Sequence, residues 1–223
     1  MQIGLIAEGA SELRILKHIV GRYLGTEHDL NEIQPKTDNE GKQIGGGGWD
    51  RVIQTFEYEN TVRDALVEND YVVIQIDTDY ADTAPFSVEK IDENGQCCSS
   101  EILHQRVLER ILSKIPNIKE EDKQRVLLAI CINEIECWLL PIYYNNDKKC
   151  KTTQCINLLN TELRKHDIHV ITEKNTFTAR NTYNTILKSL KKPKDIENIS
   201  QYQFGFNFFV QQMKKIKESL KEE

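Results

Sequence analysis

Two apolar runs that each end in acidic residues constrain most strongly what this chain can fold into. Residues 3–7 form the first run and precede Glu8, and residues 71–76 form the second and precede Asp77 and Asp79. A short, uninterrupted apolar run is typical of a strand buried on both faces of a parallel sheet. We therefore predict two parallel strands whose carboxyl ends bring these acids together, at the edge where open α/β sheets bind ligands.

The rest of the chain alternates further strands with helices. Its patterns predict strands at residues 2–7, 32–35, 71–76 and 125–132, and helices at residues 11–24, 50–69 and 100–115. This alternation indicates an α/β domain with a mostly parallel sheet flanked by helices, which we place at residues 1–142. Residues 143–223 are predicted to be a helical C-terminal part with helices at 156–163, 178–190 and 203–220. We expect its aromatic cluster to pack on the back of the α/β domain: Phe204, Phe206, Phe208, Phe209 and Met213.

Two loops flank the predicted site. Four consecutive glycines at residues 45–48 favour either a flexible connection or a mobile loop that faces a substrate. Trp49 beside them is either a core anchor, which we favour, or a stacking surface for a base. Residues 83–99 have no periodic pattern and predict a long loop, and long loops in compact domains are often functional.

Each acid that follows one of the two apolar runs has a structural alternative. Glu8 and Glu12 could stabilise the start of a helix, with Gly9 as N-cap and Glu12 in a capping box. Asp77 and Asp79 are two residues apart in an extended segment and point the same way, which suits a metal ion, although Asp-Thr-Asp also forms turns. The carboxylates of Glu8, Asp77 and Asp79 would repel one another if they converge. A divalent cation is the simplest way to offset this repulsion.

Three further acids are candidate ligands. Asp82 could be a third ligand or a water-mediated one. Glu134 and Glu136 follow the last predicted strand and reach the same sheet edge, but Asn133 and Glu136 also fit a capping box at the start of a helix. The pattern leaves open which of the two glutamates faces the site.

These motifs resemble a known fold. Glu8-Gly9 after one strand and Asp77-x-Asp79 after a later one resemble the Toprim fold of topoisomerases, bacterial primases and OLD-type nucleases. The variant Glu8-Gly9-x-Ser11-Glu12 is most similar to the nuclease branch. The segment at residues 132–140, Ile-Asn-Glu-Ile-Glu-Cys-Trp-Leu-Leu, resembles a Toprim-like domain family of bacteria, and the motifs together span about two thirds of the chain.

The resemblance implies a Toprim-like, Rossmann-like fold and Mg2+- or Mn2+-dependent phosphodiester chemistry. We expect a nuclease that acts on DNA or RNA, in defence against phage, and a separate ATPase partner, because OLD-type nucleases carry their Toprim part beside an ATPase. The expected metal ligands are Glu8, Asp77, Asp79, Asp82, Glu134 and Glu136. The expected catalytic residues are Glu8 and Glu12, and the expected substrate contacts are Gly9, Ser11, Arg180 and Lys188.

A non-catalytic reading is the alternative. In that case a Toprim-like module binds a nucleotide, nucleic acid or partner protein and uses the carboxylates structurally, locked by internal Lys or Arg pairs. The charge balance supports it, because 29 basic against 35 acidic residues excludes a protein that coats nucleic acid by charge alone. From Glu173 onward the balance reverses, to 10 basic against 6 acidic residues, so Lys174, Arg180, Lys188, Lys191, Lys192 and Lys194 either contact phosphates or form a solvated face.

Membrane and cysteine patterns place the protein in the cytoplasm. No apolar run reaches the ~18 residues that a membrane span needs, and the N-terminal residues lack a signal-peptide pattern. Of the six cysteines, Cys131 and Cys137 lie in apolar segments and are expected to be reduced core thiols. The spacings do not match a Cys-x-x-Cys zinc motif.

Overall fold

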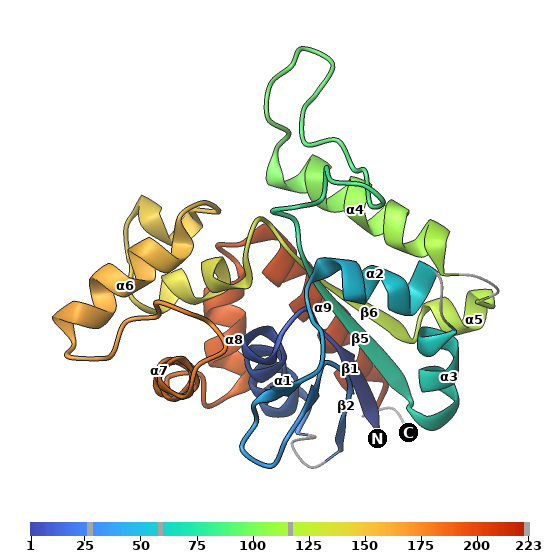
Figure 1. The fold of residues 1–223 in the computed structure, drawn as a ribbon, viewed down its shortest axis with the longest axis horizontal. Coiled ribbons are helices and arrows are strands. Elements are labelled where there is room, and N and C mark those ends of the chain that lie inside the picture. Colours follow the sequence, from blue (N-terminus) through green and yellow to red (C-terminus); the bar gives the residue numbers. More distant parts are fainter. Residues whose placement is uncertain (26–28, 58–59, 116–117, 221–223) are drawn as a thin grey trace.

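Four parallel strands in the order β2-β1-β5-β6 form the central sheet of the computed structural model, which describes residues 1–25, 29–57, 60–115 and 118–220 (Figure 1). The strands are β1 (Ile3–Ile6), β2 (Leu30–Gln34), β5 (Tyr71–Asp77) and β6 (Val126–Cys131). The predicted α/β class and parallel sheet are confirmed. A small antiparallel hairpin of β3 (Lys36–Thr37) and β4 (Gln43–Ile44) follows β2.

The strand order reverses between β1 and β5. The chain passes from β1 to β2 on one side, then returns to pair β5 with the other side of β1, with Ile3 opposite Tyr71 and Ile6 opposite Ile74. Such a reversal is a topological switch point, where the loops after the two strands diverge and leave a crevice for ligands. The segments that begin at Glu8 and Asp77 lie at this point.

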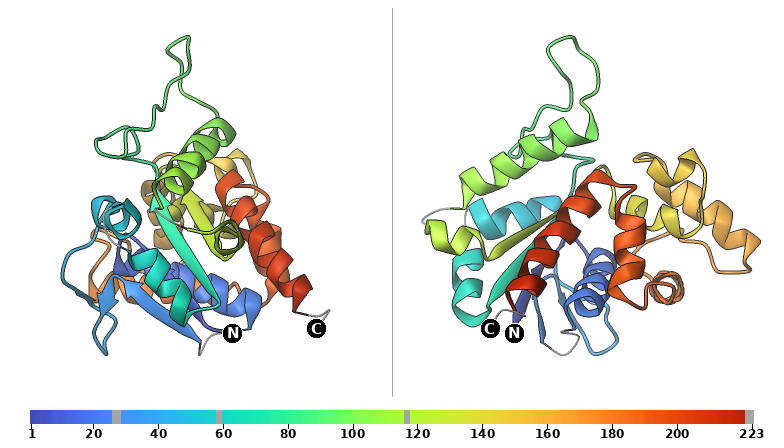
Figure 2. Two further views of the ribbon diagram at one scale, coloured as in Figure 1. Left: turned by 90° about the vertical axis from the view of Figure 1, so that its right-hand side faces the viewer. Right: turned by 180° about the vertical axis from the view of Figure 1, so that it is seen from behind.

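Helices cover both faces of the sheet (Figures 1 and 2). The helices α1 (Ala10–Leu24), α8 (Pro193–Ser200) and α9 (Phe204–Ser219) pack in one hydrophobic cluster with Val73 of β5. The helices α2 (Trp49–Glu57), α3 (Thr61–Glu68) and α4 (Ser100–Lys114) pack in a second cluster with Val72 and Ile74. Neighbouring residues of β5 thus face opposite layers, as a strand buried on both faces requires.

The predicted packing of the C-terminal aromatic cluster is also found. The ring of Phe206 stacks on Trp138 with centroids 4.5 Å apart, and Phe209 and Met213 are buried beside it. Gly205 allows α9 to approach the sheet closely, because a Cβ atom there would lie 2.0 Å from the carbonyl oxygen of Ile130. Phe204 and Phe208 differ, since they pack on the ring of His104 in α4.

Helix α9 also closes part of the outer edge of β6. The side chain of Gln212 accepts a hydrogen bond from the backbone N–H of Leu128 and donates one to its carbonyl oxygen, both at 3.0 Å. A neighbouring strand would make the same pair of contacts.

Several local expectations are wrong in detail. The single helix expected at residues 50–69 is two helices, α2 and α3, and residues 58 and 59 lie outside the described part of the chain. After β6 the chain forms a 3-10 helix, η1 (Ile135–Ile142), whose N-cap is Glu134. The expected capping box with Asn133 as N-cap is therefore absent, because Asn133 has a positive φ of 61° and its amide donates to the carbonyl of Thr152.

The remaining helices are α5 (Glu120–Lys123), η2 (Asp147–Cys150), α6 (Cys155–Lys165) and α7 (Phe177–Leu187). The segment before α4 extends away from the body of the molecule (Figure 1). Within the described residues, every helix is too short or too polar to cross a membrane.

The cysteine prediction is only half right. Cys131 is a buried free thiol, but Cys137 forms a disulfide with Cys155. The chain turns back after η1 and places the start of α6 against Cys137, across 18 residues of sequence. This return cannot be read from local spacing, so the expectation of a reduced Cys137 is wrong.

Candidate functional site

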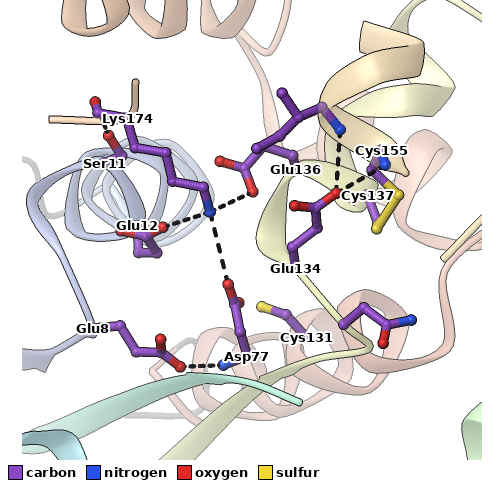
Figure 3. Close-up of polar contacts among 12 residues, drawn as sticks. Glu8, Ser11, Glu12, Asp77, Cys131, Glu134, Glu136, Cys137, Cys155 and Lys174 are labelled. Atoms are coloured by element: carbon purple, nitrogen blue, oxygen red, sulfur yellow. Dashed lines mark hydrogen bonds and ion pairs between the residues drawn. A yellow bond between two sulfur atoms is a disulfide. The ribbon is translucent and has the colours of Figure 1, made fainter. Parts of the chain in front are cut away.

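Glu8 and Asp77, the acids that follow β1 and end β5, meet across the switch point. The Glu8 carboxylate accepts a hydrogen bond from the backbone N–H of Asp77 at 2.6 Å (Figure 3). The fully buried side chain of Gln75 reinforces this contact, since it accepts from the backbone N–H of Glu8 at 3.1 Å and donates to the Asp77 carboxylate at 2.7 Å. The loops after β1 and β5 are thus fixed to each other.

A lysine from a distant segment lies among the carboxyl group of Asp77 and two further ones (Figure 3). Nζ of Lys174 is 3.0 Å from Oε1 of Glu12, 2.9 Å from Oε2 of Glu136 and 3.9 Å from Oδ2 of Asp77. Each of these three acids is at most 5% exposed. We call Glu8, Glu12, Asp77 and Glu136 the acidic group.

Neighbouring hydroxyl groups hold this arrangement in place. The fully buried Tyr183 of α7 donates a hydrogen bond to Oε1 of Glu136 at 2.5 Å. Ser11 donates to the carbonyl oxygen of Lys174 at 2.6 Å. Ser11, an expected substrate contact, therefore anchors the segment that carries the lysine.

Burial and neighbouring charges shift the pKa values of Glu8, Asp77 and Lys174. Burial raises the pKa of Glu8 to about 8, against the lowering effect of the Asp77 N–H, and the charges of Glu12 and Asp79 raise it further. Burial also raises the pKa of Asp77 well above its usual range, with a further contribution from Glu8. Burial disfavours the charge of Lys174, but Glu136, Glu12 and Asp77 outweigh this effect and raise its pKa.

The acidic group has the donor chemistry of a metal site. One oxygen from each of Glu12, Asp77 and Glu136 lies within 4.8 Å of the others, so these residues could hold a metal ion. Carboxylate oxygens are the ligands that Mg2+, Ca2+ and Mn2+ prefer. The ammonium group of Lys174 lies at the same place.

Three other expected ligands lie differently. Asp79 is exposed at the mouth of the site, and its charge acts on Glu8. Asp82 forms an ion pair with Lys90 at 3.0 Å and is more than half exposed. Glu134 accepts hydrogen bonds from the backbone N–H groups of Cys155 and Ile156, at 2.8 and 3.2 Å, and so caps α6.

Of the two glutamates that the sequence left open, Glu136 therefore joins the acidic group. A pocket of about 490 Å³ opens beside Asp79, and its lining includes Asn133, Glu134 and Gln154. Glu134 thus borders this pocket while its carboxylate is engaged by α6.

The other expected substrate contacts lie at three different places in the fold. Gly9 is the N-cap of α1, as the capping alternative predicted. Arg180 donates to the carbonyl oxygen of Glu40, near the hairpin. Lys188 lines a pocket with His18 at the far end of α1.

The glycine run lies against the site. Gly48 N–H donates to the carbonyl oxygen of Glu8 at 2.7 Å, and a Cβ atom on Gly47 would lie 2.6 Å from that oxygen. Trp49 packs partly in the core and stacks on Tyr80, the residue after Asp79, with centroids 6.3 Å apart. The glycines therefore permit close contact between this loop and the backbone of Glu8.

Comparison with protein-family models, with curated proteins and with solved structures finds no match to this chain.

Proposed function

We propose that this protein is a nuclease that hydrolyses phosphodiester bonds of DNA or RNA with the help of Mg2+ or Mn2+. The observation that carries the proposal is the imbalance of charge in the acidic group. Three carboxyl groups lie within 3.9 Å of one ammonium group, that of Lys174, and the Glu8 carboxylate joins them through the backbone N–H of Asp77. Burial and the charges of Glu12 and Asp79 raise the pKa of Glu8 to about 8. A divalent cation would relieve this repulsion and let Glu8 and Asp77 ionise.

The residues present fit such an ion. Glu12, Asp77 and Glu136 would hold it, because their oxygens already lie within 4.8 Å of one another. When bound, a divalent ion lowers the pKa of water and stabilises negative charge on phosphoryl oxygens. Without a metal ion the pKa of Glu8 is about 8, and a bound cation would lower it, so that Glu8 is suited to accept a proton near neutral pH.

Gln75 would position Glu8 for this role. It holds the backbone N–H of Glu8 and the carboxylate of Asp77 at once, from a fully buried position. The pocket beside Asp79 leaves room for a substrate to approach from outside. The choice of nucleic acid as substrate rests on the resemblance of Glu8-Gly9 and Asp77-x-Asp79 to Toprim nucleases, as do phage defence and an ATPase partner.

One observation favours a second candidate, the non-catalytic module. Lys174 forms close contacts to both Glu12 and Glu136, which is the internal lock that a structural use of the carboxylates would need. In this case the acidic group would join α1, η1 and the segment before α7 without a metal ion.

Cleavage assays separate the two candidates. The full chain is incubated with single-stranded DNA, duplex DNA or RNA in Mg2+, Mn2+ or EDTA. We expect cleavage with Mg2+ or Mn2+, and losses of about 100- to 10,000-fold in Glu8→Gln if Glu8 transfers a proton. Asp77→Asn should also be inactive, whereas the exposed Glu93→Gln should match the wild type.

Calorimetric titration with Mn2+ gives the second readout. The nuclease requires Mn2+ binding that Asp77→Asn loses. Absence of both Mn2+ binding and cleavage in the wild type would favour the module. Cleavage that persists undiminished in Glu8→Gln and Asp77→Asn would contradict the proposed site.

A further inference from the structure

A third pocket, of about 490 Å³, lies between α1, the β3–β4 hairpin and α7. Its volume is in the range of ~300–1,000 Å³ that is usual for ligand pockets. Its lining includes Ala10, the first residue of α1 and two residues after Glu8, and the polar side chains of Arg14, Lys17 and Asn184. The pocket therefore adjoins the acidic group without sharing its carboxylates.

Two guanidinium groups meet at Gly41, on the hairpin side of this pocket: Arg14 lines the pocket, and Arg180 lies beside it. Arg14 of α1 donates to Oδ1 of Asn184 at 3.2 Å, and Arg180 of α7 donates to the carbonyl oxygen of Glu40. Both flank Gly41, because a Cβ atom there would lie 2.7 Å from Nη2 of Arg14 and 3.9 Å from Nη1 of Arg180. Two like charges are thus held close together.

Both side chains have unused donors. Within the described part of the chain, Nε of Arg14 and Nε of Arg180 are buried and have no hydrogen-bond partner. Arg180 is only 8% exposed. A buried donor without a partner costs about 1–3 kcal/mol, and more when it is charged, so a ligand that satisfies both donors would bind favourably.

Three carboxylates line this pocket, those of Glu32, Asp38 and Glu40. The charge of Glu32 acts on Arg14 and that of Arg180 acts on Asp38, but both acids have closer hydrogen-bond donors. Glu32 accepts from Lys17 at 2.7 Å and from Thr37 at 2.5 Å. Asp38 accepts from the backbone N–H groups of Glu40 and Lys42, both at 2.9 Å. Among the ion pairs of the described residues, none joins a carboxylate to Arg14 or Arg180.

We propose that Arg14 and Arg180 form a phosphate-binding subsite that holds the backbone of a nucleic-acid strand next to the acidic group. The planar guanidinium group matches phosphate oxygens and favours paired hydrogen bonds. Basic side chains continue along α1 from this subsite. His18 lines both this pocket and the pocket of Lys188, which has a volume of about 940 Å³ and also carries Arg22 and Lys191. A strand along α1 would therefore pass successive basic side chains.

The identity of the phosphate-bearing chain rests on the proposed function, whereas binding of a phosphate group does not. The first test uses the full-length wild type and inorganic phosphate in EDTA. In a nitrogen–proton NMR spectrum, phosphate should shift the Nε–H resonances of Arg14 and Arg180, and leave that of Arg63 on α3 unchanged. Unshifted Arg14 and Arg180 resonances at saturating phosphate would overturn the subsite.

The second test measures binding of a fluorescent single-stranded oligonucleotide in EDTA, where cleavage does not interfere. The double variant Arg14→Gln, Arg180→Gln should bind at least about tenfold more weakly. For this variant, the slope of log K against the logarithm of the salt concentration should also become shallower by about 0.7 for each lost phosphate contact. Arg63→Gln is the matched control and should bind like the wild type.

Paired oligonucleotides with a 5′-phosphate or a 5′-hydroxyl identify the source of the phosphate. A requirement for the 5′-phosphate assigns the subsite to a strand end, and equal binding assigns it to an internal phosphodiester. Oligonucleotide binding that is unchanged in the double variant overturns the assignment to nucleic acid. A chain that binds phosphate through both arginines but never cleaves would contradict the proposed function and leave the subsite standing.

Discussion

Nζ of Lys174 lies 2.9 Å from Oε2 of Glu136, in the place where the oxygens of the acidic group converge. An internal ammonium group and an external metal ion would therefore compete for the same carboxylates. Binding of a divalent ion requires the lysine to move or the ion to sit beside it. The stability of a variant without the ammonium group separates these possibilities.

Lys174→Met should destabilise the protein by about 3–5 kcal/mol in EDTA, because it leaves buried carboxylates without their cation. If a metal ion takes the same position, Mn2+ should restore more stability to this variant than it adds to the wild type. Urea unfolding with EDTA and with Mn2+ measures both effects. The exposed Lys194→Met serves as control, and a Lys174→Met variant that Mn2+ does not stabilise would support the module.

The second prediction concerns pH. The folded-state pKa of Glu8 is about 8, above the ordinary value of 4.5, so the folded protein keeps a proton that the unfolded chain releases between these values. In EDTA this carboxyl should therefore make stability fall as pH rises from about 5 to about 8, by up to about 1.4 kcal/mol per pH unit.

Glu8→Gln should remove this slope, because an amide does not titrate. Urea unfolding over the pH range, taken as the difference between wild type and variant, isolates the effect. Taking this difference cancels the contributions of other titrating groups to the pH dependence of stability. His104 is one such group: burial lowers its pKa to about 4, so its contribution makes stability rise with pH in acid. Parallel pH profiles of the two proteins would contradict a raised pKa for Glu8.

The third prediction tests the close approach of α9 to the sheet. Gly205→Ala should destabilise the protein although alanine favours helices, because the new methyl group would lie 2.0 Å from the carbonyl oxygen of Ile130. We expect a loss of about 1–3 kcal/mol, measured by urea unfolding. Gly46→Ala, where a Cβ atom meets nothing within 4 Å, should change stability by less than about 0.5 kcal/mol.

The fourth prediction concerns the disulfide. Alkylation of the denatured, unreduced protein should modify four of its six cysteines, because Cys137 and Cys155 are paired. Reduction should lower stability by about 3 kcal/mol, as the chain-entropy relation gives for a loop of this length. Mass spectrometry and unfolding with and without reductant provide the measurements. Six modified cysteines without reductant would show that this bond does not form.

Residues at strand ends were the predictable part of the site. Glu8 and Asp77 follow apolar runs, and parallel strands bring their carboxyl ends to one edge, so their meeting follows from local patterns. Gln75 also lies in a strand, and a polar residue within an apolar run was the available signal for it. Its double contact with Glu8 and Asp77 depends on the order of the strands and not on the run itself.

Contacts between distant segments were not predictable. Lys174 is 162 residues from Glu12 in the sequence and lies in a polar segment without a period, so its position depends on how the C-terminal helices pack. The same packing brings Tyr183 to Glu136. The choice between Glu134 and Glu136 stayed open for a different reason. Glu134 is the N-cap of the 3-10 helix η1 and Glu136 is its second residue, and this local geometry directs the two carboxylates to different partners.

The pairing of Gln212 with Leu128 has a consequence for how this molecule meets others. An open sheet edge offers free N–H and C=O groups to a strand from another chain, which leads to sheet extension or aggregation. At Leu128 both groups already bond to the amide of Gln212. A partner protein that approaches the β6 side would therefore recognise the side chains of α9 and could not add a strand at this position.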